Sequence, residues 1–392
     1  MLKLNRREWL AAAVAPAMAA VKPVKITGLE FYDADIPTPK DQLEVGVQGR
    51  YTVVEVQTDA GVTGYSFAGY PAAQAPALRR IIVGQDLYAV EDHVRNGLLK
   101  FAGVEHAIWD AIGRIARQPV YKLLGGASNR VRAYLTCVWK GKLDQSHVPY
   151  GDQADMAVRI QKAGFKGMKI RAWRPNALDD VDACNEIRAA TGPDFDIMFD
   201  RTAHAPEAVG QKIWDYETGW KVARGLEKHR ALWLEEPFAR DDYRTPGRLA
   251  AAVDILITGG EGFLGIEGFH QSLQHRTYDV LQPEGERSGG ILLCRKVAML
   301  AEARNVPVIL HGTMALRLAG WLTASFAIGS EWQEVALLTP PLLPQQQWAP
   351  GLKLLRSKEM YRIEDGHFVA SDLPGLGLDV NPDALREYRV PS

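Results

Sequence analysis

The feature that most limits the fold of this chain is the regular alternation of short apolar runs and amphipathic segments between residues 130 and 340. The segments carry apolar residues at helical spacing, as in DQADMAVRIQKAG, ALDDVDACNEIRAATG and GGILLCRKVAMLAEARN. Strands that alternate with helices form parallel βαβ units. Eight runs fit a (β/α) barrel better than an open sheet, and they are YLTCVW, GMKIRAW, DIMFD, LWLEEP, ILITGGE, YDVLQPE, VPVILHG and EVALL.

The residues on either side of this alternation follow other patterns. From Val24 to about Ile82 the sequence is strand-like, with β-branched and aromatic residues and a turn signal at residues 59–61. From Val90 to Leu124 apolar residues recur every three or four positions, which predicts helix. Strands followed by helices indicate an α+β unit. Residues 341–392 leave the alternation, and we expect them to wrap back onto the first unit.

Composition and charge exclude several classes of protein. A chain of 392 residues can bury a large core and predicts two or three domains. Its hydrophobic content of 47% and charged content of 24% are those of a soluble globular protein. The net charge of -1 offers no electrostatic footprint for nucleic acid or an anionic membrane, and no run could span a bilayer. The cysteines lack metal-site spacing, so we expect buried free thiols at Cys137, Cys184 and Cys294.

The first twenty residues have the architecture of a signal peptide. They begin with basic residues, continue with an alanine-rich apolar stretch and include Ala17-Met18-Ala19 as a small-x-small cleavage pattern. The Arg6-Arg7 pair favours twin-arginine export. A short amphipathic helix is the alternative interpretation. If residues 1–20 are a signal, the folded protein is exported to the periplasm; otherwise it is cytoplasmic.

Three consecutive apolar runs end in acidic residues: Asp200, Glu235 and Glu261. The carboxyl ends of barrel strands converge on one mouth, where these carboxylates would repel one another and raise one another's pKa values. A hard divalent cation removes this conflict, and an all-oxygen ligand set suits Mg²⁺. One acid at a strand end is more simply a solvated terminus, but three in register predict a metal site. The neighbouring Glu236 is expected to point the other way or to support the ligands from an outer layer.

These motifs resemble those of the enolase superfamily and, within it, the mandelate racemase-like group, over nearly the whole chain after residue 20. AIWDAIGRIARQPVYKLLGG (107–126) is similar to the last helix of the family's capping domain, and LPGLGLDVN (373–381) is similar to its C-terminal signature. Between them the family's order is kept by GMKIRAW, DIMFD, LWLEEP, GGEGF, VLQPE and ILHG. The racemase spacing also matches the intervals between Glu235, Glu261, Glu284 and His311.

The resemblance implies an α+β capping domain that closes over a modified TIM barrel, (β/α)7β. It places the capping domain at residues 22–126, the barrel at residues 130–340 and a returning C-terminal segment at residues 341–392. It assigns the three strand-end acids to Mg²⁺. The shared chemistry is abstraction of the proton next to a carboxylate, which gives an enediolate stabilised by the metal.

Lys169 and Arg171 lie two residues apart on the second strand, so their side chains point to one face. The resemblance places them at the family's Lys-x-Lys position, with arginine replacing the second lysine. Arginine stays protonated at working pH, so Arg171 would orient a substrate carboxylate or hydroxyl instead of acting as a base. Lys169 would help to stabilise the enediolate charge. In the alternative, Arg171 lowers the pKa of Lys169 and Lys169 is itself a base.

His311 ends the seventh run, and Glu284 ends the sixth, where the family usually has Asp. A carboxylate on one ring nitrogen would fix the tautomer of His311 and stabilise its imidazolium. His311 is therefore the expected base, and then the acid that protonates a departing hydroxyl. Glu334 occupies the position of the family's acid that contacts the substrate carboxylate, and Glu331 is a near rival for that role.

Two departures from the family pattern concern the third and fourth runs. His204 lies four residues after Asp200, whereas some sugar-acid dehydratases carry an acidic histidine nearer that Asp, so we expect His204 to be a loop histidine. The segment WDYETGWKVARG (214–225) lengthens the interval between Asp200 and Glu235, which leaves the register of these two strands open.

The expected activity is Mg²⁺-dependent dehydration of an acid sugar to a 2-keto-3-deoxy acid, by removal of the α-proton and loss of the β-hydroxyl. A racemase or epimerase with two bases is the second interpretation. A non-catalytic sugar-acid-binding relative is the third, although binding alone needs no base, and a barrel hydrolase is disfavoured because such metal sites cluster histidines. Specificity would reside in loops such as residues 38–51. We expect a homo-oligomer that binds a small carboxylate substrate and neither nucleic acid nor membrane.

Overall fold

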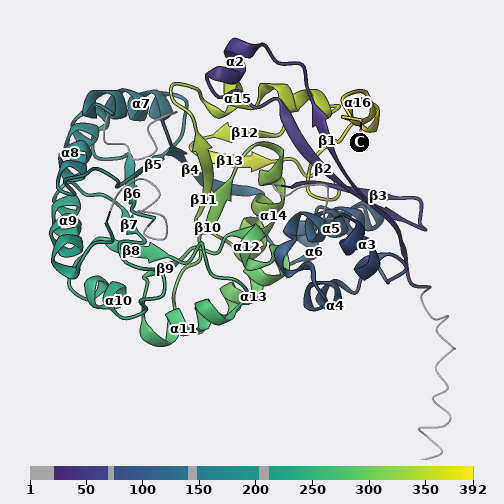
Figure 1. Cartoon of the computed structure of the whole chain (residues 1–392), viewed down its shortest axis with the longest axis horizontal. Helices are drawn as coiled ribbons and strands as arrows, with labels where there is room; N and C mark the ends of the chain where they lie inside the picture. The colour runs from purple at the N-terminus through teal and green to yellow at the C-terminus, as the bar shows by residue number, and fades with distance from the viewer. Residues whose placement is uncertain (1–21, 69–74, 140–147, 203–211, 392) are drawn as a thin grey trace, which may run out of the picture.

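A computed structural model of the protein describes residues 22–68, 75–139, 148–202 and 212–391. The segment expected to be a signal peptide and the histidine at position 204 lie outside these ranges. Within them, the chain forms a barrel and a smaller unit of sheet and helices beside it (Figure 1).

In the described residues, eight parallel strands form the barrel, and each corresponds to one of the apolar runs: β4 (Arg130–Cys137), β5 (Gly167–Arg171), β6 (Asp196–Asp200), β7 (Trp233–Glu235), β8 (Leu256–Gly259), β9 (Val280–Leu281), β10 (Leu310–Thr313) and β11 (Trp332–Leu338). Their hydrogen-bonded order is β10-β11-β4-β5-β6-β7-β8-β9. Parallel bridges from Leu281 to Val308 and from Glu284 to His311 close the remaining gap. The predicted barrel is confirmed.

Helices join consecutive strands and surround the barrel (Figure 1): α7 (Tyr150–Lys162), α8 (Asp179–Thr191), α9 (Tyr216–Lys228), α10 (Thr245–Ala250), α11 (Glu267–His275), α12 (Gly285–Ser288), α13 (Gly290–Glu302) and, after the 3-10 turn η4 (Ala315–Arg317), α14 (Leu318–Ile328). Their buried residues recur at helical spacing, as Ala154, Ala157 and Ile160 do on α7. The last strand, β11, leads into the C-terminal segment, which gives the predicted (β/α)7β order.

An apolar cluster fills the barrel below the carboxyl ends of its strands. Its large buried side chains come from different barrel strands or, for Ile309, from the residue directly before one: Tyr134, Met198, Trp233, Val280, Ile309 and Trp332. The Tyr134 ring packs edge-on against Trp233, with ring centroids 5.1 Å apart. The barrel is therefore a packed core, and polar residues at the strand ends lie on an apolar floor.

The N-terminal unit combines an antiparallel sheet with helices. The sheet order is β1-β2-β3, and the elements are β1 (Ile26–Asp35), α2 (Lys40–Glu44), β2 (Arg50–Thr58), β3 (Thr63–Ala68), α3 (Ala75–Ile82), α4 (Val90–Arg95), η2 (Leu98–Lys100), α5 (Ala102–Ala116) and α6 (Val120–Leu123). The α+β prediction is confirmed.

The expectation of strand up to Ile82 is wrong at its end, because residues 75–82 form the helix α3. Leu78 and Ile82 are four residues apart, and both are buried in the apolar core of the N-terminal unit. In a helix, residues four apart lie on one face. In a strand, the residue midway between them would lie on that face as well. The burial of Leu78 and Ile82 therefore favours a helix over a strand at residues 75–82.

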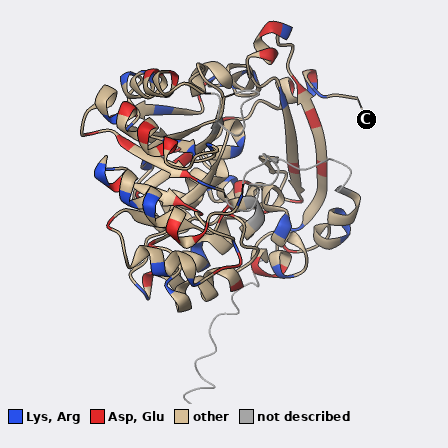
Figure 2. Ribbon diagram, turned by 60° about the vertical axis from the view of Figure 1, so that its left-hand side comes forward, with Lys and Arg blue, Asp and Glu red and all other residues tan. Residues whose placement is uncertain are grey.

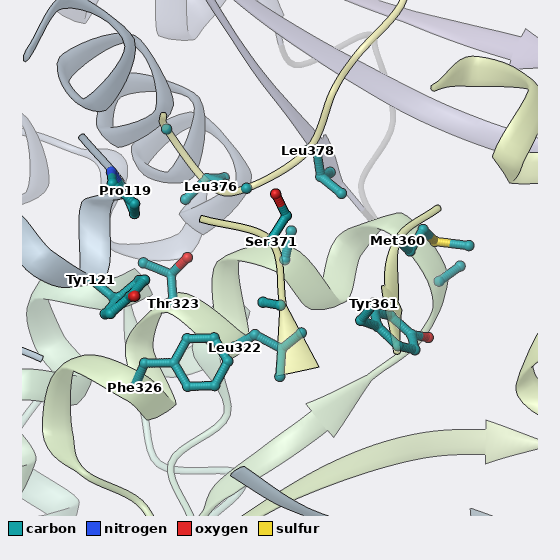
Figure 3. Close-up of a pocket in the computed structure, with 15 residues that line it drawn as sticks. Pro119, Tyr121, Leu322, Thr323, Phe326, Met360, Tyr361, Ser371, Leu376 and Leu378 are labelled. Carbon is teal, nitrogen blue, oxygen red and sulfur yellow. The ribbon is translucent and has the colours of Figure 1, made fainter. Parts of the chain in front are cut away.

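The C-terminal segment contacts both the barrel and the N-terminal unit. Its elements are α15 (Pro344–Gln347), η5 (Ala349–Leu354), β12 (Tyr361–Glu364), β13 (His367–Ala370) and α16 (Pro382–Glu387). Strand β13 pairs antiparallel with β4, and the backbone N–H of Leu376 donates to Asp110 of α5 (2.8 Å). One small pocket is lined by all three parts, with Tyr121 from α6, Phe326 from α14 and Leu378 from the segment (Figure 3).

The N-terminal unit and the barrel also meet directly. One apolar core includes Tyr32, Val53 and Phe67 of the sheet together with residues of the barrel strands and helices. In addition, the buried carboxylate of Glu105 on α5 accepts hydrogen bonds from the backbone N–H groups of residues 291 and 292 (3.0 and 2.9 Å), in the first turn of α13. A carboxylate is favoured there, because the first N–H groups of a helix lack partners within the helix.

The surface agrees with the near-zero net charge. Figure 2 shows acidic and basic residues interspersed along the outer helices of the barrel. Among the described residues, no helix combines the length and the apolar character needed to cross a membrane. The three cysteines are free and buried, as predicted.

Candidate active site

The register of strands β5, β6 and β7 brings the predicted site residues to one level. Arg171 pairs with Asp200 across β5 and β6, and Asp200 pairs with Glu235 across β6 and β7. Residues 216–228 of the longer connection form α9, whose first turn is capped by Asp215 accepting from the N–H of Thr218 (2.8 Å). The extra length is accommodated outside the barrel, so the alignment of the two acids is kept.

Lys169 lies at the centre of the carboxylates and is completely buried. Its Nζ is 2.7 Å from Oε2 of Glu235, 3.0 Å from Oε1 of Glu334 and 3.7 Å from Oδ2 of Asp200. Burial opposes its charge, but the Glu235 and Glu334 carboxylates raise the pKa of Lys169 well above its usual value. In this arrangement Arg171 does not lower the pKa of Lys169 below its usual value, and a base role for Lys169 stays an alternative that exchange of the α-proton tests.

Arg171 contacts one of the predicted metal ligands. Its Nη1 donates to Oδ2 of Asp200 and to the hydroxyl of Thr202, which itself donates to Oδ1 of Asp200 (2.6 Å). The guanidinium remains partly accessible, with 12% of its side chain exposed. It therefore lies at the edge of the cluster, where it balances Asp200 and can still reach a bound molecule.

His311 lies between two carboxylates on the other side of the cluster. Its Nε2 is 2.7 Å from Oε2 of Glu261 and 3.8 Å from Oε2 of Glu334. Burial lowers the pKa of His311, but the two carboxylates outweigh burial and raise it to about 10. Burial likewise opposes ionisation of Glu261, but His311 holds the pKa of that carboxyl well below its usual range. In this arrangement the ring is an imidazolium paired with Glu261.

The expected hydrogen bond between Glu284 and His311 is not formed, and this part of the prediction is corrected. The two residues are backbone neighbours through a parallel bridge, but Nδ1 of His311 is buried and has no hydrogen-bond partner in the described part of the chain. The helix α12 begins at Gly285, and Ser288 binds both backbone groups of Glu284 (2.7 and 3.1 Å). Glu284 therefore lies at a helix start instead of at the end of an extended strand.

Glu334 contacts two of the three cations of the cluster, Lys169 and His311. Besides Lys169, its Oε1 accepts from the hydroxyl of Thr136, and its Oε2 accepts from the backbone N–H of Gly312 (2.7 Å). Burial alone would raise the pKa of Glu334, but Lys169 and these donors lower it to about 2. Glu331, the rival for this position, is exposed.

Sequence reasoning missed several residues of the site. Thr136 and Thr202 bind the acids from β4 and from the end of β6, and the amide of Gln282 donates to Oε2 of Glu235 (3.0 Å). These residues could have been found from the alternation of side chains along a strand, because residues two apart share a face. Gln282 precedes Glu284 by two residues, and Thr136 follows the inward-facing Tyr134 by two. Polar residues at such positions in otherwise apolar runs could have been added to the predicted site.

The structure supports a cation site in this cluster. Glu235, Glu261 and His311 each offer one ligand atom, and these atoms lie within 4.8 Å of one another. Oε1 of Glu235 is buried without a hydrogen-bond partner among the described residues, and burial raises the pKa of Glu235 to about 8. A buried carboxylate oxygen without a hydrogen-bond partner fits a bound cation, and the surrounding oxygens suit a hard divalent ion. Asp200, the third predicted ligand, is not in this group: it is beside Glu235 in the register, but its oxygens bind Arg171 and Thr202.

Comparison with known families identifies the class of protein. Residues 42–125 match the mandelate racemase/muconate lactonizing enzyme N-terminal domain, and residues 152–384 match the enolase C-terminal domain-like family. The second match alone covers more than half of the chain. The protein therefore belongs to the mandelate racemase/muconate lactonizing enzyme family of the enolase superfamily, as the motifs predicted.

Two relatives of similar length are named as dehydratases of sugar acids. The arabinonate dehydratase of Saccharolobus solfataricus is 28% identical over 360 residues, which cover 86% of this chain and 90% of the relative. The D-galactonate dehydratase of Ralstonia nicotianae is 29% identical over 365 residues, which cover 85% of this chain and 89% of the relative. The chain is an enzyme of this family.

Solved structures show the same fold. The L-talarate/galactarate dehydratase of Salmonella typhimurium LT2 aligns with a TM-score of 0.73 at 22% identity and covers all of this chain and 96% of its own. A racemase of Streptomyces coelicolor A3(2), crystallised with magnesium, aligns with a TM-score of 0.73 at 23% identity and covers 93% of this chain and 100% of its own.

Proposed function

We propose that this enzyme dehydrates an acid sugar in a Mg²⁺-dependent reaction, with Asp200, Glu235 and Glu261 holding the ion. The observation that carries the proposal is the pair of side chains at the edge of the cluster: an arginine from β5 and a histidine from β10. Arginine stays protonated at working pH, so His311 is the group suited to remove and return a proton. One such group supports elimination, whereas racemisation needs a base on each face of the substrate carbon.

The residues of the chain have the following roles. The ring of His311 is an imidazolium while it pairs with Glu261, and it becomes neutral when Glu261 holds the ion instead. In its neutral form His311 takes the α-proton, and the electrons of the broken C–H bond form an enediolate. Lys169 and Arg171 stabilise the negative charge that develops on the substrate. As imidazolium, His311 then gives its proton to the departing β-hydroxyl while the C–O bond breaks, which releases water and an enol that becomes a 2-keto-3-deoxy acid. Bound Mg²⁺ supplies further stabilisation of the enediolate charge.

The racemase alternative requires a second base, and Lys169 is the residue that could supply it. Three carboxylates surround its Nζ and favour the protonated form. A lysine held in this way is suited to stabilise negative charge, and we infer that it is not the base. The contacts of Lys169 therefore support dehydration over racemisation.

A screen of the purified enzyme against a library of acid sugars in D₂O tests the proposal. We expect a 2-keto-3-deoxy acid from at least one aldonate or aldarate, because the relatives named above act on compounds of this class. No deuterated epimer of the substrate should accumulate when NMR spectra are recorded through the reaction. If a deuterated epimer forms without loss of water, the enzyme is a racemase or epimerase instead.

We also propose that the enzyme is exported to the periplasm. The proposal rests on Arg6-Arg7 and on the cleavage pattern at residues 17–19. N-terminal sequencing of protein isolated from its native cells should find a first residue near Ala20. A mature protein that begins at Met1 or Leu2 would contradict export.

A further inference from the structure

We propose that Arg240 is a positioning residue that fixes the metal ligand Glu261, with Glu236 as its anchor and Gly262 as the residue that makes room for it. This inference rests on the magnesium site of the proposed function. It also gives a role to Glu236, the second acid of the LWLEEP run, which was expected to point the other way or to support the ligands from an outer layer.

Arg240 connects the ends of two neighbouring strands. It lies in the turn after β7, and its Nε and Nη2 donate to Oε1 and Oε2 of Glu236 (3.2 and 2.9 Å). The same Nη2 donates to Oε1 of Glu261, beyond the end of β8 (2.6 Å). A guanidinium is planar and rigid, so one that pairs with two carboxylates fixes the orientation of both.

Glu236 is itself held by the backbone of β8. Its N–H donates to the carbonyl of Thr258 (2.9 Å), and its Oε1 accepts from the N–H of Gly260 (3.3 Å). Its side chain is 1% exposed. Arg240 is therefore fixed relative to the strand that carries Glu261, and the charge of Glu236 is balanced by Arg240 instead of adding to the cluster.

Gly262 leaves the space that the guanidinium occupies. A Cβ at this position would overlap Nη1, Cζ and Nε of Arg240. Arg240 can therefore occupy its position only because residue 262, directly after the ligand Glu261, has no side chain.

Pinning Oε1 of Glu261 determines which of its oxygens faces the cluster. The other oxygen, Oε2, is directed at Nε2 of His311 (2.7 Å). Two effects of Arg240 on Mg²⁺ affinity oppose each other: its positive charge disfavours a nearby cation, and its orientation of Glu261 favours binding. Because Glu236 already balances the charge through two hydrogen bonds, we expect the orienting effect to dominate.

The test is the affinity of the substrate-free enzyme for Mg²⁺, measured by titration calorimetry. Arg240→Met should raise the Kd by roughly 10–100-fold, the range typical for residues that support metal ligands. Arg240→Lys should recover part of the loss, because one ammonium cannot pair with both carboxylates in the same way. The exposed Arg248 of α10 provides the matched control, and Arg248→Met should bind Mg²⁺ as the wild type does.

Gly262→Ala provides an independent variant that keeps every charge. It should also raise the Kd for Mg²⁺, and this result tests the role of Arg240 if Arg240→Met does not fold. Unchanged or tighter binding in both variants, or no Mg²⁺ binding by the wild type, would overturn the inference. Failure of the acid-sugar screen with the Kd shift present would instead overturn the proposed function and leave the role of Arg240 standing.

Discussion

Glu235→Gln is expected to behave like the wild-type enzyme in EDTA: inactive, with the difference that added Mg²⁺ restores only the wild type. Glu235 contributes one oxygen to Lys169 and Gln282, while its other oxygen is buried without a partner among the described residues. The substitution removes the negative charge that this second oxygen would offer to a cation. We expect Mg²⁺ affinity to fall by more than about 100-fold, beyond the range for supporting residues, and turnover to fall with it.

The control for this experiment is Glu217→Gln. Glu217 is an exposed acid on α9 that pairs with Lys221, so its loss should change neither Mg²⁺ affinity nor turnover. Circular dichroism should show that Glu235→Gln is folded, since Lys169 keeps Glu334 and Asp200 as partners. Full activity of a folded Glu235→Gln variant would remove this residue from the site.

His311→Asn is expected to lose both product formation and exchange of the α-proton. Removal of a general acid or base costs roughly 10²–10⁴-fold in rate, and His311 has both roles in the proposed reaction. Exchange should be followed by NMR in D₂O with an active substrate, alongside the formation of the keto acid. Binding of Mg²⁺ should be retained, because Asp200, Glu235 and Glu261 remain.

The matched control is His270→Asn, an exposed histidine on α11, which should leave both rates unchanged. If His311→Asn still exchanges the α-proton without forming product, Lys169 is the base and His311 is only the acid. If it forms product at the wild-type rate, the assignment of His311 is wrong.

The barrel and the position of the site at the carboxyl ends of its strands could be predicted, because both follow from sequence patterns that recur with each strand. Each apolar run became one strand, and the acids at the ends of the third and fourth runs, Asp200 and Glu235, are direct neighbours in the register. Parallel strands in a barrel offer few other alignments, so residue type and position at the strand end were sufficient.

The contacts within the site could not be predicted, because they depend on the turns that follow the strands. Glu284 was expected to bind His311, but a helix begins directly after it and binds its backbone to Ser288. Arg240 carries no sequence signal, because a turn arginine is usually solvated. Its contact with Glu261 arises only when the turns after β7 and β8 are brought together and Gly262 leaves space.

The core shared by the N-terminal sheet and the barrel has a consequence for how substrate enters. Swinging the N-terminal unit away as a rigid lid would expose apolar side chains such as Phe67 and would break the contacts of Glu105 and Asp110. Exposure of only ~200 Å² of apolar surface costs about 5 kcal/mol, which limits such an open state to well under 1% of molecules. We therefore expect substrate entry and product release to involve loops at the rim of the barrel instead of separation of the two units. Exchange of those loops between relatives should therefore change the preferred acid sugar while the two halves of the enzyme stay in place.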